Sequence, residues 1–139
     1  EIASQLSDHS QIDIGRHFLA AALTGLGDLN GAANEFVQAI NMLNRSNARL
    51  ELCNALEAFA FWSSKKGDDH SAVLLCGATQ SAREKIGFPV GAQAREARRR
   101  ALAASGKTLE VRQRERADVA GGRLSLGEAV ALALRLAAA

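Results

Sequence analysis

The chain has 139 residues, of which 47% are hydrophobic and only 4% aromatic, and its formal net charge is +2. This length is sufficient for one domain with a hydrophobic core of its own, without cross-links. The apolar residues are mostly Ala and Leu, which are strong helix formers. A single proline and few β-branched runs argue against a sheet. We therefore expect an all-α protein.

The composition also argues against a disulfide-rich or membrane-spanning protein. Two cysteines, Cys53 and Cys76, are too few for a disulfide framework, and we expect both to be free and buried in a cytoplasmic protein. Charged residues interrupt the apolar stretches well short of the ~20 residues that a membrane span needs. The chain begins without Met inside an expected helix, so we interpret it as a piece of a longer protein.

The first part of the chain reads as four helices joined by short polar turns. Residues 1–9 are expected to end a preceding helix or to fray. The helix over about 10–26 is predicted to bury one stripe, made of Ile14, Phe18, Ala21, Ala22 and Leu26. Three more helices are predicted: one through Leu43, one over about 48–66, and one over about 69–86 that ends before Pro89.

One turn motif, Gly-Asp-x-x-x-Ala, occurs twice, forty positions apart. Gly27 and Gly67 are expected to end a helix, since glycine adopts the left-handed conformation without steric cost. Asp28 and Asp68 are expected to cap the helix that follows, and the motifs close with Ala32 and Ala72. A repeat of this length is typical of stacked helical hairpins, in which one unit cannot bury its apolar face alone.

The pattern changes after Pro89. A basic helix over about 91–105 contains Arg95, Arg98, Arg99 and Arg100, a charged helix follows over about 108–120, and Gly121-Gly122 reads as a flexible break. Ser125 and Glu128 form a capping box at the start of the last helix. We divide the single domain into two hairpins, 1–89, and a basic C-terminal helical cap, 90–139. Charge follows this division, since residues 1–82 carry 5 Lys/Arg and 9 Asp/Glu (net −4) and residues 83–139 carry 12 and 6 (net +6).

Several of these pieces resemble a known family. The turn motif resembles the tetratricopeptide repeat, although its period of forty exceeds the usual ~34 residues. The order and spacing of residues 52–60, 67–68, 74–78, 83–89 and 122–134 resemble the C-terminal tetratricopeptide-like region of bacterial STAND-class signal-transduction ATPases, the LuxR-type and adenylate-cyclase-type regulators. The resemblance spans about residues 10–136 and departs from the family at 106–121, which is unusually charged.

The resemblance implies antiparallel hairpins stacked into a short right-handed solenoid with a C-terminal helical cap. It also implies a role as a sensor or self-association arm in transcription regulation or signal transduction. The ATPase and DNA-binding domains would precede or follow this region in the parent chain. The family's nucleotide-binding motif GxxxxGK[ST] does not occur in these residues.

Catalytic, metal and cofactor sites are not expected. Asp68, Asp69 and His70 form the tightest group of potential metal ligands, but consecutive residues at a helix start point around the axis and not at one ion. His9 and His17 have no neighbour suited to nucleophilic catalysis. We therefore expect a chain that is not an enzyme.

The candidate interaction surface consists of Phe61, Trp62 and the arginines at 95, 98, 99 and 100. Packing in the core is the competing explanation for the aromatics, and a solvated face is the competing explanation for the arginines. We expect the partner to be a protein or peptide, a second copy included, and not a membrane. The alternative function is a nucleic-acid-binding helical domain that uses the basic segment 83–123.

Overall fold

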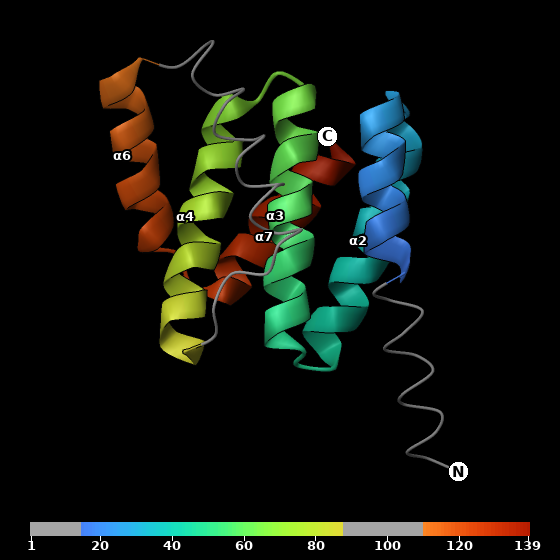
Figure 1. Ribbon diagram of the computed structural model, residues 1–139, viewed down its shortest axis with the longest axis horizontal. Helices are drawn as coiled ribbons and strands as arrows, with labels where there is room; N and C mark the ends of the chain where they lie inside the picture. The colour runs from blue at the N-terminus through green and yellow to red at the C-terminus, as the bar shows by residue number, and fades with distance from the viewer. Residues whose placement is uncertain (1–14, 88–109) are drawn as a thin grey trace.

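The computed structural model describes residues 15–87 and 110–139, and these form helices without any strand (Figure 1). The helices are one over residues 15–26, α2 (Leu29–Arg45), α3 (Arg49–Lys65), α4 (Asp69–Ile86), α6 (Val111–Gly122) and α7 (Leu126–Ala138). They pack as sequential antiparallel pairs, which confirms the all-α prediction. Within the described ranges, no helix is long and apolar enough to cross a bilayer.

The two Gly-Asp turns have the same construction. Gly27 and Gly67 adopt positive φ values of 89° and 94°, in the left-handed region that ends a helix. Asp28 and Asp68 follow as N-caps, and each accepts a hydrogen bond from the backbone amide three residues later, at 3.0 and 3.1 Å. Each turn therefore ends one helix and starts the next as the sequence indicates, which fixes the two hairpins.

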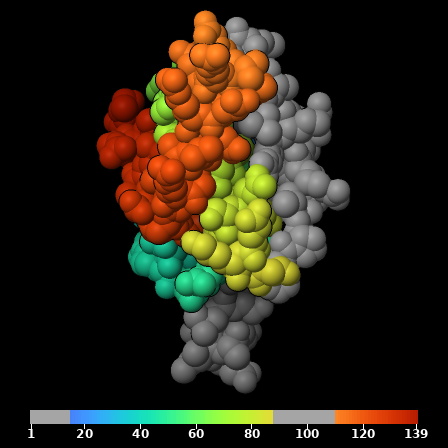
Figure 2. Space-filling model, turned by 90° about the vertical axis from the view of Figure 1, so that its left-hand side faces the viewer, coloured from blue at the N-terminus to red at the C-terminus, as the bar shows by residue number. Residues whose placement is uncertain are grey.

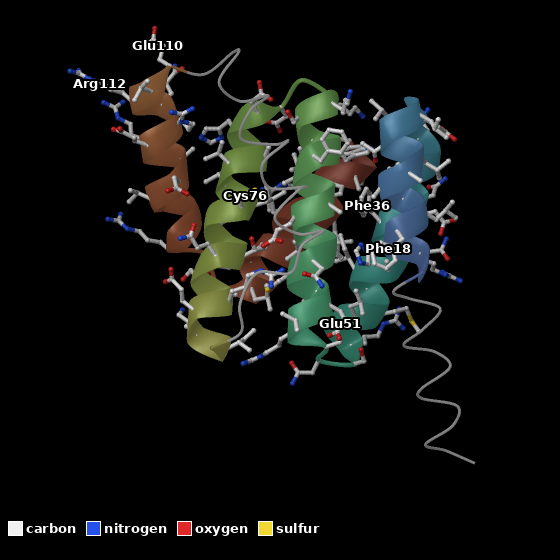
Figure 3. All side chains as sticks on the ribbon, viewed as in Figure 1. Phe18, Phe36, Glu51, Cys76, Glu110 and Arg112 are labelled. Carbon is white, nitrogen blue, oxygen red and sulfur yellow. The ribbon has the colours of Figure 1, made fainter. Side chains whose placement is uncertain are left out.

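The hairpin core combines alanines with a small aromatic cluster. Ala32 and Ala72 are completely buried where each turn leads into its helix. Phe36 and Phe59 meet edge to face with ring centroids 5.3 Å apart, and Phe59 stacks on Trp62 at 4.8 Å. Figure 3 shows Phe36 between α2 and α3, and the ring contacts therefore join these two helices.

Helix α6 packs on α4 with the two backbones in contact. A Cβ added at Gly121 would lie 2.2 Å from the carbonyl oxygen of Leu74, and one at Gly77 would lie 2.7 Å from that of Asp118. Real Cβ atoms do not approach so closely, so this contact requires glycine at both positions. The flexible break predicted at 121–122 is wrong, because α6 continues through Gly122 and uses the first of these glycines for packing.

Helix α7 returns across the layer formed by the hairpins. It contacts α2, α3 and α4, and Figure 1 shows it passing behind α4 and α3. The predicted capping box is present, since the amide of Glu128 donates to Ser125 Oγ and the amide of Ser125 donates to Glu128 Oε1, both at 3.0 Å. Hydrogen bonds to the Glu128 carboxylate, first from the Ser125 backbone amide and second from the Ser125 side chain, hold the pKa of Glu128 below its usual value. The predicted helix 91–105 lies outside the described residues.

The helix over residues 15–26 is turned differently from the prediction. It buries His17, Ala20 and Thr24, whereas Phe18 is 42% exposed and Leu26 is 83% exposed. Of the other residues of the predicted stripe, Ala22 is exposed, Ala21 is half-buried and Ile14 lies outside the described range. Small side chains let the buried side sit close to its neighbours, and the Thr24 hydroxyl is satisfied by donating to the carbonyl of Ala20 at 2.8 Å.

The glycine contact predicts that Gly121→Ala lowers the free energy of unfolding by about 2 kcal/mol or more, because α6 must move away from α4. Gly122→Ala is the matched control, since nothing lies within 4 Å of a Cβ added there. We expect the control to change stability by less than about 1 kcal/mol. Urea denaturation followed by circular dichroism measures both, and equal effects of the two substitutions would contradict the assigned contact.

His17 predicts a pH dependence of stability. Its side chain is 5% exposed, its Nδ1 has no hydrogen-bond partner among the described residues, and burial lowers its pKa. The unfolded state takes up a proton below about pH 6.5, while the folded state resists it until a lower pH. The contribution of His17 to the free energy of unfolding is complete above pH ~6.5. It falls as the pH drops below that value, by at most about 1.4 kcal/mol per pH unit.

Thermal melts between about pH 5 and 8 measure this slope. We expect His17→Gln to flatten the melting-temperature profile, and His70→Gln, which alters an exposed histidine, to leave the slope unchanged. The assignment is wrong if His17→Gln retains the wild-type slope.

Candidate functional site

The most distinctive surface is an apolar side of the first described helix that no other described residue covers, which we call the outer face. Phe18 is 42%, Leu19 49% and Leu26 83% exposed, and Ala22 between them is also exposed. Gly15 and Gly25 complete the face, made of Gly15, Phe18, Leu19, Ala22, Gly25 and Leu26, and nothing lies within 4 Å of a Cβ added at either glycine. Spacings of three and four residues place all six on one side of the helix.

The contacts on the opposite side of this helix hold the outer face in place. Ala21 and Leu23 pack against the core, and Arg16 Nη1 donates to the side chain of Gln38 on α2. The backbone amide of Asp28 donates to the carbonyl of Leu23 at 2.9 Å, which closes the helix end. In Figure 1 this helix stands at one edge of the molecule, at the opposite end from α6. These contacts therefore fix the orientation of the helix that carries the outer face.

A second surface, the arginine stripe, lies on the exposed side of α6. Arg112, Arg116 and Arg123 lie with Val119 around a shallow hollow of about 610 Å³. Among the residues that the structure describes, no ion pair engages these arginines. Figure 3 shows Arg112 pointing away from the rest of the molecule, and Figure 2 shows α6 on the molecular surface. Val119 is 56% exposed, which gives the stripe an apolar component.

The aromatic part of the predicted surface is divided between core and surface. Trp62 is 2% exposed, and its Nε1 donates to the carbonyl of Leu29 at 2.8 Å, so it fastens α3 to the start of α2 and presents no surface. Phe61 is half-buried, and Lys65 Nζ lies 5.5 Å from its ring centroid. Of the two, only Phe61 can contribute to a binding surface. The arginines predicted with them, Arg95, Arg98, Arg99 and Arg100, lie outside the described residues.

Sequence reasoning missed a buried ion pair between α3 and α4. Arg83 Nε donates to Glu57 Oε1 at 2.9 Å and Arg83 Nη2 donates to Glu57 Oε2 at 3.1 Å, with a further bond to Asn54 Oδ1. Both residues are almost completely buried, and Arg83 Nη1 has no hydrogen-bond partner in the part of the chain that the structure describes. The available signal was the position of Glu57, a lone acidic residue inside the apolar run from Leu56 to Ala60.

The thiol of Cys53, which is buried beside this pair, has low reactivity. Burial raises the pKa of the Cys53 thiol to about 11, while the nearby Arg83 opposes the shift. A thiol with this pKa is scarcely ionised at neutral pH and is a poor nucleophile. The Glu57–Arg83 pair thus reads as structural, since neither it nor the thiol is accessible to a substrate.

The predicted turn residues are accounted for by capping. Asp68 accepts from the helix start, Asp69 Oδ1 accepts from the Ser64 hydroxyl at 2.8 Å, and His70 is exposed. In the two described stretches, no group of three or more His, Cys, Asp and Glu residues is arranged to hold a metal ion. The side chains of this turn therefore serve the fold.

The buried pair predicts a large effect of removing one partner. Glu57→Gln leaves the Arg83 charge buried without compensation, and we expect it to lower the free energy of unfolding by about 3–5 kcal/mol. The double variant Glu57→Leu/Arg83→Met removes both charges and should recover most of that loss. Glu84→Gln, on the exposed side of α4, is the control in the same denaturation series. Equal stability of the Glu57 and Glu84 variants would contradict the pair's role.

Comparison with known proteins identifies no relative of this chain. No family model, no curated protein and no solved structure matches the chain. The outer face and the arginine stripe are therefore the observations from which a function is inferred.

Proposed function

We propose that this chain is a non-catalytic protein-interaction domain that mediates association with a partner protein or with a second copy. The outer face carries this proposal. Soluble monomers rarely leave a contiguous group of large apolar side chains in water, and such groups mark interaction sites. Here Phe18, Leu19 and Leu26 are between 42% and 83% exposed on one helix, with no charged residue among them.

The arrangement of the helices supports the same proposal. We propose that the hairpins are tetratricopeptide-like, stacked as a short right-handed solenoid with the segment after residue 89 as its C-terminal cap. Both hairpin turns share one Gly-Asp construction, and each hairpin packs on the next. In such arrays a terminal helix without a neighbour leaves apolar surface uncovered. Among the residues that the structure describes, the helix over residues 15–26 comes first, and its outer face is exposed.

We further propose that the parent protein is a bacterial transcriptional or signalling regulator of the LuxR type. In this proposal the helical domain binds its partner on the outer face, and the stacked hairpins transmit that event to ATPase or DNA-binding domains in the parent chain. The support is the order of motifs over residues 52–134 together with the all-helical architecture.

The arginine stripe favours a second candidate function, binding of nucleic acid. Arg112 and Arg116 on α6 and Arg123 at its C-cap line one hollow and form no ion pair with any residue that the structure describes. Aligned arginines suit phosphates, whose binding weakens steeply as salt rises. Glu115 shares the stripe and the exposed Asp118 lies nearby on the same helix, which reduces its net charge. We therefore rank this function below protein binding.

A selection experiment tests the main proposal. A phage-displayed library of amphipathic helical peptides, panned on the immobilised chain, should yield apolar-faced peptides that bind in the micromolar range. The double variant Leu19→Glu/Leu26→Glu should lose this binding, because it places charges in the outer face. Val119→Glu is the matched control, since it introduces the same charge at an exposed apolar position on α6.

Other results would contradict the main proposal. Peptide binding that survives Leu19→Glu/Leu26→Glu, or a panning experiment that yields no binder, would overturn the outer face as the protein-binding site. Fluorescence polarisation with labelled duplex DNA at low salt tests the second function. Binding that is lost in Arg112→Glu/Arg116→Glu/Arg123→Glu would replace protein binding with nucleic-acid binding as the better-supported function.

A further inference from the structure

We infer that the arginine stripe and the adjoining side of α7 form a docking surface for an acidic amphipathic helix of a partner protein. The hollow along α6 continues into a second hollow of about 380 Å³ between α4, α6 and α7, because Ala120 lines both. We call the stripe and this second hollow, with Leu124, Leu132 and Arg135, the α6–α7 face. Figure 2 shows α6 and the start of α7 on one face of the molecule, with α4 beside them. This surface is distinct from the outer face, so the inference goes beyond the proposed function and does not depend on it.

The α6–α7 face is cationic. It contains four arginines, the three of the stripe and Arg135 on α7, against two glutamates, Glu115 and Glu128. All four arginines are exposed, and among the described residues none of them forms an ion pair. The packing of α6 on α4 does not require them, since α6 buries Ala117 and Gly121 there. The excess positive charge is therefore available to an acidic partner.

Apolar side chains accompany these charges. Val119 lies between Arg116 and Arg123 along α6 and is 56% exposed. Leu124 and Leu132 are half-buried and line the second hollow. A partner that carries carboxylates beside an apolar stripe matches both parts of the face. Burial of the apolar part supplies affinity, while the charges set orientation and speed of association.

The same features disfavour nucleic acid as the occupant. A nucleic-acid strand presents phosphates at regular spacing, so some of them would lie against Glu115 and Glu128. The residues that line the two hollows include no aromatic side chain on which a base could stack. A protein segment, by contrast, can place carboxylates opposite the arginines and uncharged side chains opposite the glutamates. An acidic protein segment therefore fits this face better than a polynucleotide does.

The length of the stripe indicates the form of the partner. Arg112 and Arg123 lie at its two ends, about 16 Å apart along the helix axis. A helix of about three turns spans this distance. Residues three and four positions apart share one side of a helix, so it can present apolar side chains with carboxylates at their margins. We expect micromolar affinity that falls as salt rises, because the charges of the face are exposed.

Fluorescence polarisation with designed peptides tests this inference on the full chain. The probe is a labelled helical peptide of about 18 residues with leucines on one side and glutamates beside them. One matched peptide has Gln in place of every Glu and another has Ala in place of every Leu. Both should bind at least about tenfold more weakly than the probe.

Variants of the chain locate the binding. Arg116→Gln/Arg123→Gln should weaken probe binding about three- to tenfold, the range expected for two exposed charge pairs. Arg45→Gln/Arg49→Gln is the matched control, since it removes two exposed arginines of α2 and α3 and should leave probe binding unchanged. Circular dichroism checks that all four substitutions, which lie at exposed positions, retain the helices.

A crossed comparison separates this inference from the proposed function. Val119→Glu should weaken binding of the acidic probe at least about tenfold and spare the apolar-faced peptides selected on the outer face. Leu19→Glu/Leu26→Glu should have the reverse effects. Salt gives the same separation, because the outer face carries no charge and only the acidic probe depends on charge. Loss of one kind of binding alone therefore shows which of the two surfaces has been assigned wrongly.

The inference fails if the probe does not bind the full chain, or if Arg116→Gln/Arg123→Gln leaves its binding unchanged. Equal binding of the peptide without leucines would reduce the interaction to general charge attraction and overturn the docking surface. Labelled duplex DNA that binds more tightly than the probe through the same arginines would make nucleic acid the occupant. Self-association in sedimentation velocity that Arg116→Gln/Arg123→Gln abolishes would make a second copy the occupant. Either result overturns the acidic partner.

Discussion

Helices rich in alanine stabilise a fold only when their axes come close together, and this constraint governs the whole arrangement. A small side chain buries little surface and reaches a neighbour only across a short distance. The structure meets the constraint at Ala32 and Ala72, which are completely buried beside the turns, and at Gly77 and Gly121, where two backbones touch. Phe36, Phe59 and Trp62 add one aromatic cluster between α2 and α3.

Close packing of small residues has a weakness, because smooth faces can slide past one another. The Glu57–Arg83 pair addresses this weakness between α3 and α4. Its three hydrogen bonds, two between the charged groups and one to Asn54, are satisfied in a single register of the two helices. Buried ion pairs add little net stability but penalise every arrangement that separates them. We interpret this pair as the element that fixes the register of the second hairpin.

The local features of the fold could be read from the sequence because they depend on neighbouring residues. Asp28, Asp68 and Ser125 cap helices through hydrogen bonds to residues within three positions, so their identity and spacing suffice. The orientation of the helix over residues 15–26 could not be read in this way. Its larger apolar residues suggested the buried side, whereas the structure buries Ala20 and Thr24, which its neighbours can approach more closely.

Features that depend on distant residues were also missed. Gly121 looks like a helix breaker in isolation, and only the carbonyl of Leu74, far away in the chain, explains why glycine is needed there. Glu57 and Arg83 are 26 residues apart, so the sequence around either residue does not indicate that the other is its partner. The outer face, likewise, was recognisable only after the buried side of its helix was known. The candidate site therefore depended on tertiary packing far more than the helices did.

The return of α7 has a consequence for how the molecule loses its structure. In a simple linear array each repeat touches only its neighbours, so the ends can fray while the middle persists. Here α7 contacts α2, α3 and α4 at once and buries Ala129, Val130 and Ala133 among them. Detaching it would uncover three helices together, and detaching the first hairpin would uncover α7. We therefore expect the described helices to melt together, in a single cooperative transition.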